Sequence, residues 1–228
     1  MPYLILIILI VALVFGPQLW AQWAFRRHSK NREDIPGTGA ELARHLLDKM
    51  NITGVGVEQT DKGDHYDPEE RMVRLSPGNH DGRSLTAVAV AAHEVGHAIQ
   101  HHRSEKLLAT RSRLIRAAQL AQQVGAGFMF AIPLITALTR APQSGLLLFL
   151  IGLGSMGMAT LVHLVTLPVE WDASFHKALP LLTHGRYINK RDEKAVRQIL
   201  RAAAFTYVAA SLASLLNLAR WFALLRRA

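Results

Sequence analysis

Residues 88–100 read VAVAAHEVGHAIQ, an Ala- and Val-rich run without Pro that predicts a helix. Ser84, just upstream, can cap its first turn. Residues four apart share one face of a helix, so the imidazoles of His93 and His97 should lie together. Two imidazoles at this spacing suit a Zn²⁺ ion, and Glu94 between them can take a proton from a water held there. A purely structural helix with two core histidines would leave this Glu on an apolar helix unexplained.

The composition narrows the classes of protein to which the chain can belong. Of its 228 residues, 50% are hydrophobic and none is Cys, which excludes disulfides and thiolate ligands to a metal. The formal net charge of +9 could suggest nucleic acid as a partner, but no basic stripe interleaved with aromatic residues is present. The Lys and Arg residues gather instead beside long apolar runs, which is typical of membrane proteins.

The apolar runs predict a mainly α-helical, multi-pass membrane protein, with the lipid bilayer as a partner. Transmembrane helices are expected at residues 3–25 and, as a hairpin, at 124–167, and a transmembrane or interfacial helix at 202–225. Two cytoplasmic segments, at 26–123 and 168–201, lie between them. Basic residues directly follow the first run and none precedes it, so the positive-inside rule puts the N-terminus outside and the histidine helix in the cytoplasm.

Two short strands are predicted ahead of the histidine helix, at residues 52–59 and 72–76. Turn residues lie between them, so we expect a short β-hairpin beside the helix. Such an edge often holds the backbone of a substrate by strand addition. A hairpin that only covers the helix explains the same pattern, and the sequence leaves both alternatives open.

A catalytic zinc site needs a third protein ligand and a fourth position that stays open to water. This ligand has to come from the same side of the membrane as His93, and the chain returns to that side after the predicted hairpin. Glu170 stands just beyond the return and is the best candidate, with Asp172 as its rival. Ser174, one turn further, could form a hydrogen bond to a ligand. In the alternative interpretation, Glu170 and Asp172 bind no metal and only balance the charge of nearby Lys and Arg residues.

The chain resembles the YugP-type bacterial membrane zinc metallopeptidases over nearly its whole length. The likeness rests on the apolar N-terminal run, the histidine helix, and the sequences YDP at 66–68, VRLSP at 73–77 and PVEWDAS at 168–174. It implies a neutral zinc peptidase of the bacterial inner membrane, with a zincin-like cytoplasmic α+β catalytic portion. More distantly, residues 170–173 are similar to the Glu-aromatic-x-Ala-Asp motif of HtpX-type membrane proteases, whose Glu is the third zinc ligand. Ser174 stands here where those proteins have Asp.

A peptidase also needs a donor for the oxyanion that forms when water adds to the amide. Related gluzincin peptidases often supply His, Tyr or Arg after the third ligand, which makes His184, Arg186 and Tyr187 the candidates here. A cationic loop in solvent would contain the same residues.

Together these features predict a zinc endopeptidase with one Zn²⁺ per chain, held by His93, His97 and Glu170, and with Glu94 as general base. Membrane-associated or unfolded proteins would be its substrates. An intramembrane-cleaving protease is a second hypothesis, but it would carry the motif inside a spanning helix. A zinc-binding scaffold is a third, but it would have no use for a base beside the metal. A membrane-protein partner or a homo-oligomer is compatible with all three.

Overall fold

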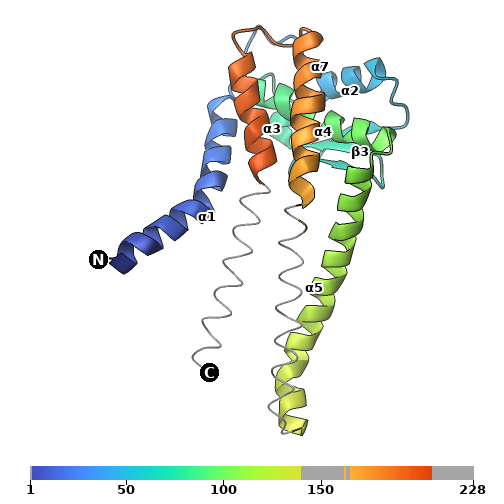
Figure 1. The fold of residues 1–228 in the computed structure, drawn as a ribbon. Coiled ribbons are helices and arrows are strands. Elements are labelled where there is room, and N and C mark those ends of the chain that lie inside the picture. The colour runs from blue at the N-terminus through green and yellow to red at the C-terminus, as the bar shows by residue number, and fades with distance from the viewer. Residues whose placement is uncertain (1, 140–161, 163–164, 207–228) are drawn as a thin grey trace. The chain divides into compact units, whose positions relative to one another are not determined.

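The structure is a computed structural model that describes residues 2–139, 162 and 165–206 (Figure 1). The chain divides into two compact units. Of the described residues, 2–15, 110–139, 162, 165 and 166 belong to the first unit, and 16–109 and 167–206 belong to the second. Helix α1 (Pro2–Arg27) begins in the first unit, which also holds most of α5 (Lys106–Thr139).

The prediction of a multi-pass membrane protein is wrong for the described part of the chain. No helix among residues 2–139, 162 and 165–206 is long and apolar enough to cross a membrane. Helix α1 holds Pro17 within it, and the division between the two units falls after Phe15. The first half of α5 carries four basic residues, Lys106, Arg111, Arg113 and Arg116. Most of the hairpin predicted at 124–167 and of the helix predicted at 202–225 lies outside the described residues.

The second unit is built around α4 (Leu85–His102), the helix predicted from the His-Glu motif. Its first turn is capped as expected, because the hydroxyl of Ser84 accepts a hydrogen bond from the Ala87 N–H at 3.0 Å. All residues from 85 to 100 are buried. A helix that is buried on every face needs cover on every face, and the rest of the unit supplies it.

The cover consists of helices and a small sheet. The helices of this cover include α2 (Gly39–Lys49), the short α3 (Pro77–His80), residues 167–171, the π-helical η1 (Asp172–Ala178), α7 (Leu179–His184) and residues 193–206. Apolar side chains from these elements form one core with α4, among them Leu46, Leu47, Leu182, Ile199 and Leu200. Segments 16–109 and 167–206 therefore share one main hydrophobic core, with a small separate cluster at Ala21, Ala24 and Ala202.

An ion-pair network also joins these two segments of the second unit. The guanidinium of Arg32 donates hydrogen bonds to both oxygens of Asp192, at 2.8 and 3.0 Å, and to Asp34. These carboxylates hold the pKa of Arg32 well above its usual range, while Arg32 lowers the pKa of Asp34 to about 2. The network thus fixes residues 32–34 to the start of the helix at 193–206.

The sheet differs from the predicted hairpin. It has three strands, β1 (Gly56–Gln59), β2 (His65–Asp67) and β3 (Met72–Leu75), in the order β1-β3-β2. The two strands predicted from the sequence, now β1 and β3, run parallel, and the short β2 pairs antiparallel with β3. A parallel pair needs a longer connection than a hairpin turn, and β2 lies within that connection.

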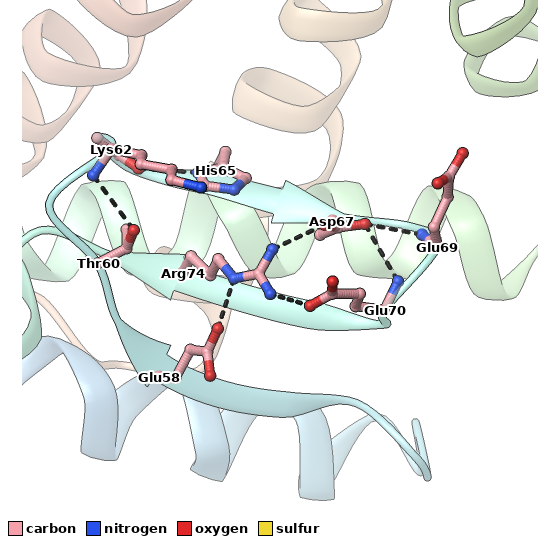
Figure 2. Close-up of polar contacts among 9 residues, drawn as sticks. Glu58, Thr60, Lys62, His65, Asp67, Glu69, Glu70 and Arg74 are labelled. Carbon is pink, nitrogen blue, oxygen red and sulfur yellow. Dashed lines mark hydrogen bonds and ion pairs between the residues drawn. The ribbon is translucent and has the colours of Figure 1, made fainter.

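Ion pairs between charged side chains join the strands on one face of the sheet. Figure 2 shows Arg74 on the central strand with its guanidinium directed at acids from all three strand regions. It bonds to Glu58 of β1 at 2.5 Å, to Asp67 of β2 at 2.7 Å, and to Glu70 in the turn before β3. Cross-strand pairs of opposite charge stabilise a sheet, so this cluster helps to fix the register.

Candidate metal centre

The two histidines of α4 face one point, as the four-residue spacing predicts. The ring centroids of His93 and His97 are 4.8 Å apart, and each residue is 5% exposed. The acid between them, Glu94, is 6% exposed. Carboxylates are seldom buried to this extent in an apolar helix without a role that holds them there.

Glu170 completes the cluster from the helix at residues 165–171. Its Oε2 atom lies 3.1 Å from Nε2 of His93 and 3.1 Å from Nε2 of His97, and the residue is 1% exposed. The ligand atoms of the three side chains all lie within 4.8 Å of one another. Residues more than 70 positions apart in sequence therefore form a buried group that could hold a metal ion.

The other ring nitrogens have protein partners of their own. The Nδ1–H of His93 donates to the hydroxyl oxygen of Ser174 at 3.0 Å, and that hydroxyl in turn donates to the carbonyl of Leu200. The Nδ1–H of His97 donates to Oε1 of Gln100 at 2.9 Å. With Nδ1 protonated in both neutral rings, each Nε2 keeps its lone pair, which is the form that binds metals.

This set of donors fits zinc. Two lone pairs and a carboxylate oxygen that face one point repel one another unless a proton or a metal cation lies among them, and a metal cation would satisfy all three. In a tetrahedral zinc site with zinc–ligand distances of about 2.0–2.2 Å, two ligand atoms are separated by about 3.3 Å. The two separations between Nε2 and Glu170 Oε2 are close to this value, at 3.1 Å each. Nitrogen and carboxylate ligands in this number are also what a catalytic zinc site uses.

The pKa of Glu170 agrees with a role as a charged ligand. Burial by itself raises the pKa of this carboxyl, but positive charge on His97 and His93, with their hydrogen bonds, holds it well below its usual range; a bound cation facing neutral rings would favour the carboxylate in the same way. The side chain is therefore a carboxylate at neutral pH.

A close approach of two backbones brings Glu170 and Ser174 to α4. A Cβ atom added at Gly96 would lie 2.7 Å from the carbonyl oxygen of Ala173 in η1, which is closer than real Cβ contacts. In η1 the chain is wound more widely than in an α-helix, and the N–H of Leu179 bonds five residues back to the carbonyl of Ser174. Short π-helical turns of this kind are frequent at functional sites. Gly96 is thus the residue that lets η1 lie against the histidine helix.

Asp172, the rival third ligand, lies outside this cluster and makes other contacts. Its carboxylate accepts hydrogen bonds from the Gln100 amide at 2.7 Å, from His176 at 3.2 Å and from the ammonium of Lys177. Burial would raise the pKa of Asp172, but Lys177 and Gln100 lower it.

The three predicted oxyanion donors lie at and after the end of α7. The hydroxyl of Tyr187 is 2.8 Å from Nε2 of His45 and accepts a hydrogen bond from Lys49 at 3.2 Å, so its polar contacts go to α2. Arg186 has a left-handed backbone with φ of 58°, and His184 is the last residue of α7. Arg186 and Tyr187 line one surface cavity, and His184 and Tyr187 line another. Within the described residues, neither cavity is lined by the metal cluster.

Gln100 is a site residue that the sequence reasoning missed. It follows His93 by seven residues and His97 by three, so helical periodicity places it on the same face of α4. Reading that face one turn further would have found it.

The buried His-His-Glu cluster is a possible metal site of the kind that a zinc peptidase requires. The chain belongs to the family described as "Putative neutral zinc metallopeptidase", whose model matches residues 3–226. It is also 37% identical, over 223 residues and 95% of each chain, to a Bacillus subtilis (strain 168) protein named "Putative membrane protease YugP". No solved structure matches significantly. The resemblance found in the sequence is thus confirmed, and zinc is the cofactor of this family of peptidases.

Proposed function

We propose that the protein is a zinc-dependent endopeptidase in which His93, His97 and Glu170 hold one Zn²⁺ and Glu94 is the general base. The observation that carries this proposal is the position of Glu170 Oε2, 3.1 Å from both Nε2 atoms in a buried site. The membership in a zinc peptidase family supports the same reaction.

The chain's own residues account for the proton transfers of peptide hydrolysis. Zinc in this site would polarise the water and the scissile carbonyl. Glu94 takes a proton from the water as it attacks and then delivers it to the leaving amine. Burial strengthens this role, because electrostatic interactions are stronger where water is excluded.

Proteins or peptides are the substrates that this chemistry implies. Among the described strands β2 pairs only with β3, so its outer edge is available to an extended peptide. The hydroxyl of Tyr66 in β2 bonds to Nδ1 of His101 at 2.8 Å, which ties this edge strand to α4 one turn beyond His97. A peptide added at β2 would lie beside the histidine helix, and a sheet that only covers this helix would make the same contact.

The predictions of an oxyanion donor, a substrate preference and a binding partner rest on other grounds than the geometry of the metal cluster. The oxyanion donor remains a prediction for His184, Arg186 and Tyr187, because their contacts lead to α2 and to surface cavities. A preference for membrane-associated or unfolded substrates rests on the relative named as a membrane protease. An oligomer or a membrane-protein partner likewise remains a prediction.

Cleavage of casein by purified protein of known zinc content tests the proposal. Glu94→Gln removes the base but keeps the size of the side chain, so it should retain zinc and lose about 10²–10⁴-fold of the activity. Glu193→Gln is the matched control, since this acid pairs with Arg197 on the surface helix at 193–206. Zinc binding by the wild type without any cleavage would favour a zinc-binding scaffold instead. Full activity in Glu94→Gln would contradict the role of Glu94 as general base.

A further inference from the structure

Gln100 occupies a buried position between α4 and the segment that carries Glu170. Its amide is 1% exposed and forms three hydrogen bonds. Oε1 accepts from the Nδ1–H of His97 at 2.9 Å, while Nε2 donates to the carbonyl of Val169 at 3.0 Å and to Asp172 at 2.7 Å. Both the carbonyl oxygen and the NH₂ group of the Gln100 side chain therefore have hydrogen-bond partners.

The neighbours of Gln100 determine which way its amide points. If the amide were turned over, Oε1 would face a carbonyl oxygen and a carboxylate, and both contacts would be between acceptors. Val169 and Asp172 thus require the NH₂ group on their side. Oε1 must then face His97, and the ring of His97 must carry its proton on Nδ1.

Asp172 is itself held in place by charge. The ammonium of the buried Lys177 contacts its carboxylate and also pairs with Glu105 at 3.1 Å. Asp172 and Lys177 are five residues apart within η1, a spacing that the i→i+5 turn of a π-helix brings onto one face. An α-helix would instead align residues three and four apart.

From these contacts we infer that Gln100 and Asp172 are positioning residues for the metal ligand His97. Asp172, fixed by Lys177, orients the Gln100 amide, and the amide holds the imidazole of His97 in the tautomer and ring angle that direct Nε2 at Glu170. This inference rests on the proposed function, because it needs zinc at the His93, His97 and Glu170 cluster. It assigns Asp172 a role that is distinct from metal ligation.

The two histidines are therefore held by different means. The partner of His93 is a hydroxyl that is anchored on the backbone carbonyl of Leu200. The partner of His97 is an amide at the end of a chain of charged side chains. Changes at Asp172 should accordingly reach His97 through Gln100 and leave the hydrogen bonds of His93 in place.

Zinc affinity in a competition titration with a chromophoric chelator tests the inference without using activity. Gln100→Met keeps the length and burial of the side chain but removes its acceptor, so zinc should bind about 10–100-fold more weakly. The absorption spectrum of the Co²⁺-substituted variant should change as well, because the ring of His97 is no longer fixed. Ile99→Met is the control, a buried and volume-conserving change on the same helix that should leave both readouts unaltered.

A double-mutant cycle separates this role from a general loss of packing. Asp172→Asn alone, at a partly exposed position, should weaken zinc binding in the same direction but less strongly. If both residues act through His97, the double variant should bind zinc no more weakly than Gln100→Met, within about twofold. Additive losses, or wild-type affinity and an unchanged Co²⁺ spectrum in Gln100→Met, would overturn the inference and leave the proposed function intact. A wild type that binds no zinc would instead overturn the proposed function.

Discussion

Two clusters of ionisable side chains in the second unit of the protein differ in how far their side chains are exposed to solvent. The Arg74 cluster on the sheet joins one guanidinium to three acids, whose side chains are 24–64% exposed (Figure 2). The cluster of His93, His97 and Glu170 joins two rings to one acid, and their side chains are at most 6% exposed.

The difference shows what marks a functional site in this fold. In the Arg74 cluster every contact joins a donor to an acceptor, so the cluster is satisfied by its own side chains. In the histidine cluster the rings have used their Nδ1–H groups elsewhere, and three acceptor atoms converge out of reach of solvent. A buried arrangement that lacks a cation is costly, whereas an exposed and balanced one is nearly neutral.

The largest expected effect comes from separating the two backbones at the buried cluster. In Gly96→Ala the new methyl group would meet the Ala173 carbonyl at 2.7 Å, so α4 and η1 must move apart. We expect a loss of about 1–3 kcal/mol in the free energy of unfolding, together with weakened zinc binding. Gly78→Ala is the control, because a Cβ at that position meets nothing within 4 Å. Equal stability and zinc content in both variants would mean that the close approach is unimportant.

A smaller effect is expected when only the partner of His93 is removed. Ser174→Ala deletes the hydroxyl that links Nδ1 of His93 to the Leu200 carbonyl. Zinc affinity should fall about tenfold or somewhat more, with little change in the fold, as measured by chelator competition and circular dichroism. Ser174→Thr keeps a hydroxyl and should recover part of the affinity if it fits. Unchanged affinity in Ser174→Ala would show that His93 needs no such support.

On the sheet, even the loss of a whole cluster should matter little. Arg74→Ala removes the common partner of Glu58, Asp67 and Glu70, yet exposed ion pairs contribute about 1 kcal/mol or less. Urea unfolding should therefore show a small, salt-sensitive loss of stability, and zinc content should stay at the wild-type level. A large loss of zinc in this variant would mean that the two clusters are coupled.

The smallest expected effect is a dependence of stability on acid pH at the sheet cluster. Hydrogen bonds from the backbone N–H of Glu70 and Glu69 and from Arg74 lower the pKa of Asp67, although burial opposes them. A carboxyl with a depressed folded pKa stabilises the protein above its unfolded value of about 3.9, and this contribution is lost as the pH falls through the folded value. The stability difference between wild type and Asp67→Asn should thus shrink on acidification below pH 4. A difference that does not change with pH would contradict this.

What the sequence could predict depended on how local each feature is. The helix with His93 and His97 follows from spacing within a few residues, and its cap at Ser84 does too. Glu170 could be proposed from the motif around it and from the family resemblance, although its distance to the histidines needed the structure. Gln100 shares the same helical face, so the information was present but was not used.

The errors came from features that depend on distant parts of the chain. Strand pairing is nonlocal, so a parallel pair of β1 and β3 could not be told from a hairpin, and β2 is too short to give a pattern of its own. The membrane prediction rested on long apolar runs, and no helix among the described residues is long and apolar enough to cross a membrane. The π-helical turn of η1 follows from no local sequence pattern, yet it brings Ser174 and Asp172 to the site.

The measurement that tests the central claim most directly is the zinc content per chain of wild type and Glu170→Gln, after dialysis against a weak chelator. The amide keeps the volume of the side chain but removes the charge that faces both Nε2 atoms. We expect one zinc per wild-type chain and very little in Glu170→Gln, while Arg74→Ala retains the full amount. Full zinc occupancy in Glu170→Gln would contradict the assignment of Glu170 as the third ligand.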